Sequence, residues 1–217
     1  MKRTLTIAAT TLLVSAPAFG DDYKGAPTFE VTITNVTPGQ TFTPILAATH
    51  RSSVSYFELG KPASAEIAEL AESGSTAGLE ALLAGVPNLV FDTASTGGLL
   101  GPGESITIEV RARGQFSRLS LAGMLIPTND TFVALNNVPL PRQGASYTAI
   151  AYDAGSELND ELCANIPGPY CKGEGLSDEN GEGFVHVSSG VHGFADLDPG
   201  VFDWRNPVAR VEVSRKK

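Results

Sequence analysis

Two acidic clusters border strand-like segments in the second half of the sequence. Asn129 and Asp130 lie between two apolar runs, and Asp153 and Glu157 are four residues apart across a turn that contains Gly155. Carboxylate oxygens on turns anchored by β-structure are ligands that Ca²⁺ prefers. If the strands that carry these turns end on the same side of the fold, Asp130, Asp153 and Glu157 form a calcium site. The alternative is that they are ordinary turn residues, because Asp and Asn favour turns for backbone reasons.

A further acidic run, from Asp178 to Gly183, has the pattern that opens a helix–loop–helix calcium loop. The match fails at the twelfth position, where Ser189 stands in place of a bidentate Glu, and the flanking residues are typical of strands. We therefore assign no site of that type. A weaker contribution of this run to a different calcium site stays open.

The three histidines, His50, His186 and His192, are candidate zinc ligands. No HExxH pattern or fixed spacing supports such a site, and structural histidines are the more common case. The sequence also lacks a G-x-S-x-G nucleophile motif and a dinucleotide-binding G-x-G-x-x-G motif. The chain is therefore predicted not to be an enzyme. Two alternatives stay open: a zinc-dependent hydrolase of the cell envelope, and a metal-free structural envelope protein.

The first 20 residues have the features of a signal peptide. Lys2 and Arg3 precede an apolar stretch from Leu5 to Val14, and small residues allow cleavage after Ala18 or Gly20. The stretch is shorter than the ~20 residues that span a bilayer, which disfavours the alternative of a retained anchor. We therefore predict a secreted or periplasmic protein with one domain over residues 21–217.

Net charge and cysteine content narrow the function further. The formal net charge of −9 excludes nucleic-acid binding and binding to anionic lipid, because both partners would repel the chain. Cys163 and Cys171 are eight residues apart, and export favours a disulfide between them. A pair of metal thiolates is the alternative, but no other cysteine completes such a site.

Most of the chain has the residue pattern of strands separated by Gly and Pro turns. Apolar and polar residues alternate over 29–33, 106–110, 119–125 and 209–213, which indicates strands with one buried face. Further strands are predicted at 43–48, 53–59, 131–135, 146–152 and 184–188. Many short strands indicate an all-β fold, an antiparallel sandwich or barrel.

One interval departs from this pattern. Residues 63–71 and 76–84 are rich in Ala, Leu and Glu, with apolar residues at helical spacing. Gly74 lies between them and can end the first helix in a left-handed conformation. We predict a two-helix insertion at 63–84 that covers one edge or open end of the sandwich.

The sequence resembles the spondin amino-terminal domain, the module of F-spondin and mindin, in an exported bacterial form. Pro127-Thr-Asn-Asp-Thr-Phe132 is similar to the family's P-S-P-D-W-F run, and Tyr152-Asp-Ala-Gly-Ser-Glu157 is similar to its Y-D-A-G-T-D run. The closing segment from Asp203 to Val211 and the amino-terminal FEVTITN run also fit. Together these segments extend over nearly the whole chain after the signal peptide.

The resemblance implies a β-sandwich related to calcium-dependent phospholipid-binding domains, with one Ca²⁺ near the loops at one end. Its ligands would be Asp130, Asp153 and Glu157, with Asn129 as the alternative to Asp130. Glu157 stands where animal members have Asp, and its longer side chain would change the coordination geometry. The family also implies a binding or adhesion module, whose partner would be an unknown extracellular protein or carbohydrate.

Overall fold

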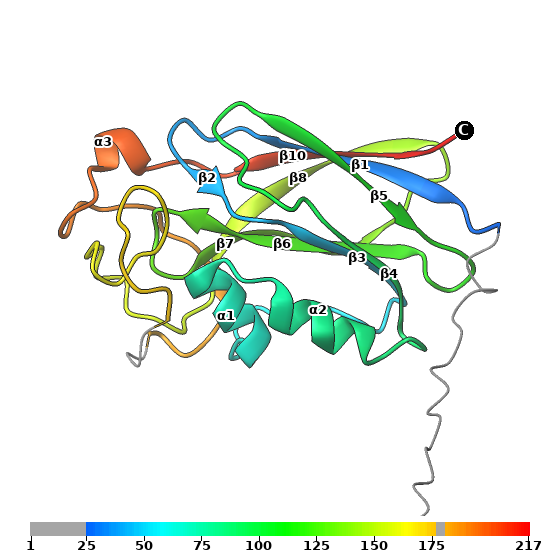
Figure 1. Cartoon of the computed structure of the whole chain (residues 1–217), viewed down its shortest axis with the longest axis horizontal. Coiled ribbons are helices and arrows are strands. Elements are labelled where there is room, and N and C mark those ends of the chain that lie inside the picture. The colour runs from blue at the N-terminus through cyan, green and yellow to red at the C-terminus, as the bar shows by residue number, and fades with distance from the viewer. Residues whose placement is uncertain (1–24, 177–180) are drawn as a thin grey trace, which may run out of the picture.

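The strands form one antiparallel sheet that curves until its two edges lie close together (Figure 1). The computed structural model describes residues 25–176 and 181–217, so the predicted signal peptide lies outside the described residues. The strands are β1 (Thr28–Asn35), β2 (Thr41–Phe42), β3 (Leu46–His50), β4 (Val90–Ser95), β5 (Ser105–Arg111), β6 (Arg118–Ile126), β7 (Thr131–Pro139), β8 (Gly144–Asp153), β9 (His186–Val187) and β10 (Ala209–Arg215). Their order is β4-β3-β6-β7-β8-β10-β1-β5, with β2 paired to β6 and β9 to β8. The predicted all-β class is confirmed.

Side chains bridge the two edges of the sheet. The Asp92 carboxylate of β4 accepts the backbone N–H of Arg111 in β5 at 2.7 Å. The Thr49 hydroxyl of β3 donates to the Arg111 carbonyl at 2.6 Å. The outward-facing backbone groups of Arg111 are therefore satisfied without a neighbouring strand.

The main core lies inside the curved sheet. In β1 and β10, every second residue is buried, including Val31, Ile33, Val211 and Val213. This arrangement follows the predicted alternation, because successive side chains of a strand point to opposite faces of the sheet.

A second apolar cluster lies between the outer face of the sheet and the helices α1 (Ala65–Ser73) and α2 (Ala77–Ala84). Ser64 caps α1 by accepting the N–H of Ile67 at 3.3 Å. Gly74 ends α1 with a φ of 71°, as predicted, and a Cβ there would lie 2.6 Å from Thr43 Cγ2. The predicted insertion is confirmed, and through α2 it contacts the edge strand β4, in line with the predicted position over an edge. It covers the outer face of β3, β6 and β7 (Figure 1).

This second layer changes the burial of β6. Its inward-facing residues Leu119, Leu121 and Leu125 belong to the main core, while the outward-facing Ala122 contacts the helices' cluster. All residues of β6 after Arg118 are buried. The strand is therefore covered on both faces, whereas alternation alone predicts one exposed face.

The predicted strand at 53–59 is wrong, because this segment is a loop. The Asn136 side chain accepts the Tyr56 N–H at 2.9 Å and donates to the Phe57 carbonyl at 2.8 Å. Tyr56 is buried in the second cluster, and Phe57 packs edge-on against Phe132. A side-chain amide thus replaces strand pairing, and the aromatic side chains are buried from a loop.

The long segment between β8 and β10 gathers at one end of the sheet (Figure 1, yellow to orange). It contains β9 and a short helix, α3 (Pro199–Phe202). The predicted disulfide is present within it and joins Cys163 to Cys171, whose Cα atoms are 4.6 Å apart. We call this end of the sheet, formed by residues 127–130, 154–176 and 181–208, the loop end.

The helical layer generates a stability prediction. Ile67→Ala removes a fully buried side chain and should lower the free energy of unfolding by about 2–5 kcal/mol. Leu82→Ala, on the partner helix, removes a half-exposed side chain and should change it by only about 0.5 kcal/mol. Urea unfolding measures both variants. Equal effects of the two substitutions would contradict the buried contact of α1 with the sheet.

Candidate metal centre

The start of β7 and the end of β8 bring two acidic residues side by side. Thr131 is paired with Asp153 in the sheet register, and Asp130 directly precedes Thr131. The Ala154 N–H continues this pairing by donating to the Asp130 carbonyl at 3.1 Å. The two turns that carry the predicted acids therefore lie at the same end of the sheet.

The Asp130 carboxylate is fully buried and anchors the turn after β8. Its Oδ2 accepts the backbone N–H of Ser156 at 2.8 Å and that of Glu157 at 3.1 Å. Its Oδ1 is enclosed and has no hydrogen-bond partner within the described part of the chain. One oxygen of Asp130 thus fixes the turn, and the other is buried without a hydrogen bond from a described group.

The three predicted ligands also interact electrostatically. Burial and the nearby charge of Asp153 raise the pKa of Asp130 to about 8, although the N–H groups of Glu157 and Ser156 oppose this shift. The buried Glu157 raises the same pKa further. Burial also raises the pKa of Asp153. Asp153 and Glu157 therefore both disfavour the charged form of Asp130 when no cation is bound.

The side chain of Asn129, the alternative to Asp130, is hydrogen-bonded to another loop. Its amide donates to Asp160 at 3.0 Å and its oxygen accepts the N–H of Glu161 at 3.2 Å. The Glu161 carboxylate in turn accepts the N–H groups of His192 and Phe194. Of the two neighbours, Asp130 is the one with an oxygen available to a ligand.

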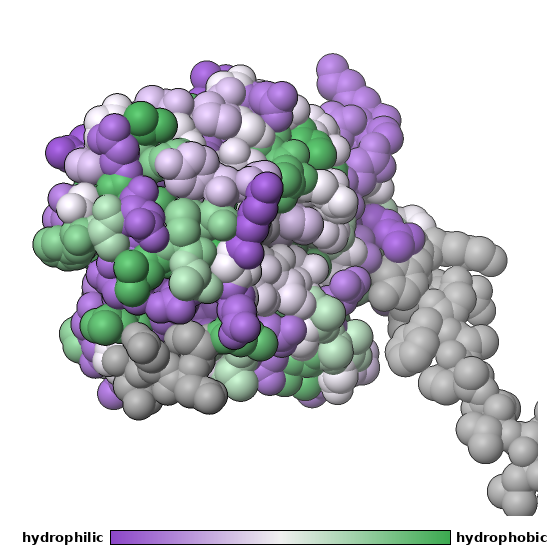
Figure 2. All heavy atoms as spheres, turned by 60° about the vertical axis from the view of Figure 1, so that its left-hand side comes forward, coloured by the Kyte–Doolittle hydropathy of each residue, from purple (hydrophilic) through white to green (hydrophobic). Residues whose placement is uncertain are grey.

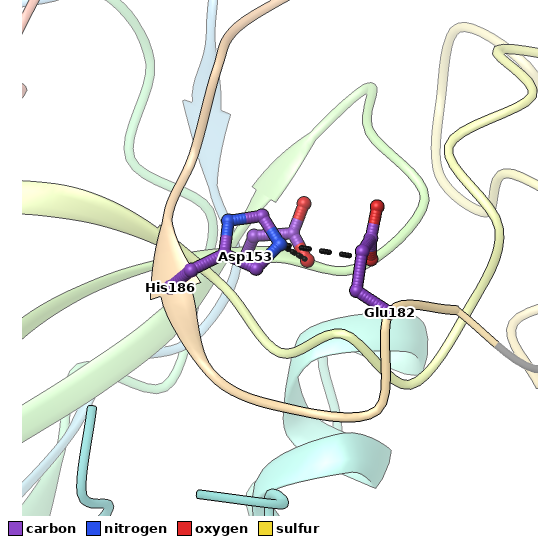
Figure 3. A group of neighbouring side chains, drawn as sticks. All are labelled: Asp153, Glu182 and His186. Atoms are coloured by element: carbon purple, nitrogen blue, oxygen red, sulfur yellow. Dashed lines mark ion pairs between the residues drawn. The ribbon is translucent and has the colours of Figure 1, made fainter. Parts of the chain in front are cut away.

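Asp153 also belongs to a second group, with Glu182 and His186 (Figure 3). One potential ligand atom from each residue lies within 4.8 Å of those of the other two. His186 Nε2 is 3.4 Å from Asp153 Oδ1 and 3.6 Å from Glu182 Oε2. Figure 3 shows the imidazole of β9 pointing toward both carboxylates, one at the end of β8 and one in the loop before β9.

The carboxylates of Asp153 and Glu182 affect the pKa of His186. Burial alone would lower the pKa of the imidazole. The hydrogen bond to the Val187 carbonyl and the charges of Asp153 and Glu182 outweigh that effect and raise the pKa. The site therefore attracts a positive charge at the position of Nε2.

A comparison with known protein families gives a match over the part of the chain that carries the predicted acids. The model of the spondin N-terminal domain matches residues 28–157, more than half of the 217 residues. The chain belongs to the spondin N-terminal domain family. No curated protein matches the sequence.

The matched segment of this spondin domain contains Asp130, Asp153 and Glu157 and ends before Glu182 and His186. Spondin N-terminal domains are extracellular and are not a known enzyme family. The Cys163–Cys171 disulfide is consistent with an oxidising compartment. In the described ranges, 25–176 and 181–217, no helix is long and apolar enough to cross a membrane.

The other two histidines of the spondin domain have their own partners. His50 is buried, and its ring nitrogens lie 2.8 Å from the Arg51 carbonyl and 2.8 Å from the Ser120 hydroxyl. His192 lies 3.8 Å from the Glu161 carboxylate. His50 is aligned with the Pro139 end of β7, whereas His186 is aligned with its Thr131 end, about 25 Å away. A zinc site shared by these two histidines is therefore excluded.

Sequence reasoning predicts neither Glu182 nor His186 as a companion of Asp153. Glu182 belongs to the acidic run that fails as a helix–loop–helix calcium loop, and His186 follows it by four residues. The pairing of β9 with β8 brings both next to Asp153. An acidic run followed by a short strand with a histidine is the sequence signal, but the partner strand cannot be identified from it.

The raised pKa of Asp130 predicts a pH-dependent difference between wild type and Asp130→Asn in chelator. A carboxyl whose pKa is raised on folding contributes its stability below about pH 4 and loses it as the pH rises through about 8. The neutral Asn keeps the acceptor for Ser156 and Glu157 and does not titrate. The stability of the variant relative to wild type should therefore increase by roughly 1–4 kcal/mol between pH 5 and pH 8.

Chemical denaturation at each pH measures this difference, and groups common to both proteins cancel. If the free energies of unfolding of the two proteins change with pH in the same way, the pKa of Asp130 is not raised in the folded protein.

Proposed function

We propose that this spondin domain is an exported binding module whose loop end is ordered by Ca²⁺ bound to Asp130, Asp153 and Glu157. The observation that carries the proposal is the fully buried Asp130, with one enclosed oxygen that no described group hydrogen-bonds. A buried polar oxygen of this kind normally has a partner, so an ion is the expected one. The adjacent buried acids supply further oxygen ligands.

The donor chemistry at these three residues fits a hard divalent cation. Ca²⁺ takes six to eight oxygen ligands, and backbone carbonyls and waters complete the set that carboxylates begin. The ion would neutralise the mutual repulsion of acids that burial prevents from being screened by water. It would supply charge and cross-linking of the turns, and the proposed function requires no chemical reaction.

The surface of the loop end is suited to a partner. Figure 2, which turns this end toward the viewer, shows apolar side chains scattered among polar ones. Most of the exposed large apolar side chains that the structure describes lie in the segment between β8 and β10: Leu158, Leu162, Tyr170, Leu176, Phe184, Val187, Phe194 and Val201. Single exposed apolar side chains are normal on protein surfaces, so it is their concentration in one segment that supports the proposal. An extracellular protein or carbohydrate is the partner that we propose, in an adhesion-like role.

The calcium proposal predicts a metal-dependent melting temperature. Ca²⁺ at about 100 times its dissociation constant should stabilise wild type by about 2.7 kcal/mol, a rise of roughly 5–10 °C over the value in chelator. Asp130→Asn and Asp153→Asn should lose this rise because each removes a carboxylate ligand. Differential scanning calorimetry measures the shift.

Glu80→Gln provides the matched control, since Glu80 is an exposed acid on α2, outside the acidic cluster. It should keep the full calcium-induced rise. If Asp153→Asn melts like wild type at every calcium concentration, these acids are not the ligands.

A further inference from the structure

We propose that Asp153, Glu182 and His186 form a second metal site, selective for a divalent transition metal such as Zn²⁺. The site differs from the calcium site in its ligands, since it includes a nitrogen donor and only Asp153 is common to both. Glu182 and His186 lie beyond the segment that matches the spondin family.

The hydrogen bond of the other ring nitrogen determines which tautomer faces the carboxylates. His186 Nδ1 lies 3.0 Å from the Val187 carbonyl, which can only accept a hydrogen bond. Nδ1 therefore carries the proton in the neutral ring, and Nε2 presents a lone pair. This is the arrangement in which metal-bound histidines are held, with one nitrogen on the metal and the other on a backbone carbonyl.

Distances distinguish a metal site from an ion pair. An imidazolium that donated to a carboxylate would lie about 2.7–2.9 Å from the oxygen. Nε2 is instead 3.4 Å from Asp153 Oδ1 and 3.6 Å from Glu182 Oε2, and it makes no hydrogen bond within the described residues. Two ligands bonded to Zn²⁺ at 2.0–2.1 Å with a tetrahedral angle lie about 3.3–3.4 Å apart. The 3.4 Å distance matches the edge of a zinc tetrahedron and the 3.6 Å distance is slightly longer, and both are too long for a charge-assisted hydrogen bond.

The surrounding groups hold the three ligands in this arrangement. Asp153 Oδ1 accepts the N–H of Gly155 at 2.8 Å, and its Oδ2 accepts the Asn159 amide at 2.9 Å. The same amide lies 3.3 Å from Glu182 Oε1. Asn159 therefore orients both carboxylates from outside the group, as outer-shell residues of metal sites do.

Gly155 allows the loop before β9 to approach Asp153. Its φ is 63°, and a Cβ at this position would lie 2.3 Å from the Phe184 carbonyl oxygen. The Gly155 carbonyl accepts the Gly183 N–H at 2.8 Å. A side chain at position 155 would push the loop that carries Glu182 and His186 away from β8. The close contact therefore requires glycine at this position.

The degree of exposure leaves room for a fourth ligand. The Asp153 side chain is 1% exposed, whereas those of His186 and Glu182 are 27% and 40% exposed. One side of the group therefore reaches solvent, where a water can complete four-coordination. A nitrogen and two carboxylates are a donor set that suits Zn²⁺ better than Ca²⁺, which prefers oxygen alone.

The test is a zinc titration of the chain purified without a polyhistidine tag and stripped of metal by chelator. Isothermal titration calorimetry with Zn²⁺ should give one site per chain that depends on His186. His186→Gln should weaken zinc binding at least tenfold, because even the loss of an outer-shell group has an effect of about that size. His192→Gln, which changes the other exposed histidine beside a carboxylate, should bind zinc like wild type.

Substitution with Co²⁺ gives an independent readout. A tetrahedral site should give the intense visible absorption bands of four-coordinate Co²⁺, and His186→Gln should lose them. The melting temperature of His186→Gln in chelator shows whether the variant is folded.

Absence of zinc binding to wild type, or equal binding by wild type and a folded His186→Gln, would overturn the proposal in favour of a simple imidazolium–carboxylate pair. Should His186→Gln be unfolded, Glu182→Gln, which changes an exposed loop residue, takes its place with the same expected loss. The outcome is separate from that of the calcium experiment, because zinc binding that depends on His186 supports this site whether or not Ca²⁺ stabilises the chain.

Discussion

The buried Asp130 carboxylate ties the turn after β8 to the turn before β7, and the geometry of the loop end follows from this tie. Two backbone N–H groups of the later turn point at one of its oxygens. The same turn holds Asp153 through Gly155 and holds the loop before β9 through the Gly155 carbonyl. One buried carboxyl group thus organises segments that are distant in sequence. Burial of its charged form is unfavourable without a compensating cation, which is why the proposed ion would stabilise this end of the fold.

The sheet beneath the loop end provides a rigid base for these residues. β6 is packed on its inner face against the main core and on its outer face against the layer under the helices. β7 continues that layer through Phe132 and Ala134 and carries Asp130 at its start. A residue next to a strand that is packed on both faces has little freedom to move, which favours a fixed position for Asp130.

Local pattern was sufficient to predict most of the fold. Strands with one solvated face, such as β1, β5 and β10, follow their alternation, and Gly74 ends α1 as its residue type indicates. β4 escaped prediction because its Asp92, Thr93 and Ser95 interrupt any apolar pattern. The strand predicted at 53–59 was wrong because Asn136, a distant residue, supplies the hydrogen bonds that a strand would have required.

In the candidate site, too, some residues could be predicted from local sequence and others could not. The closeness of Asp130 and Asp153 could be anticipated, because they adjoin strands that turned out to be neighbours. The Glu157 N–H is bonded to Asp130 from the turn that follows. Glu182 and His186 depend on the pairing of a two-residue strand, which no local pattern specifies.

The bridged edges of the sheet have a consequence for association. An unpaired edge strand is a template on which another chain can add a strand, a common route to aggregation. In this domain the Asp92 carboxylate accepts a hydrogen bond from the N–H of Arg111 on the edge strand β5, and the Thr49 hydroxyl donates to the Arg111 carbonyl. A bound peptide or a second copy would have to displace both side chains to extend the sheet there. Addition of a further strand is therefore suppressed at this edge.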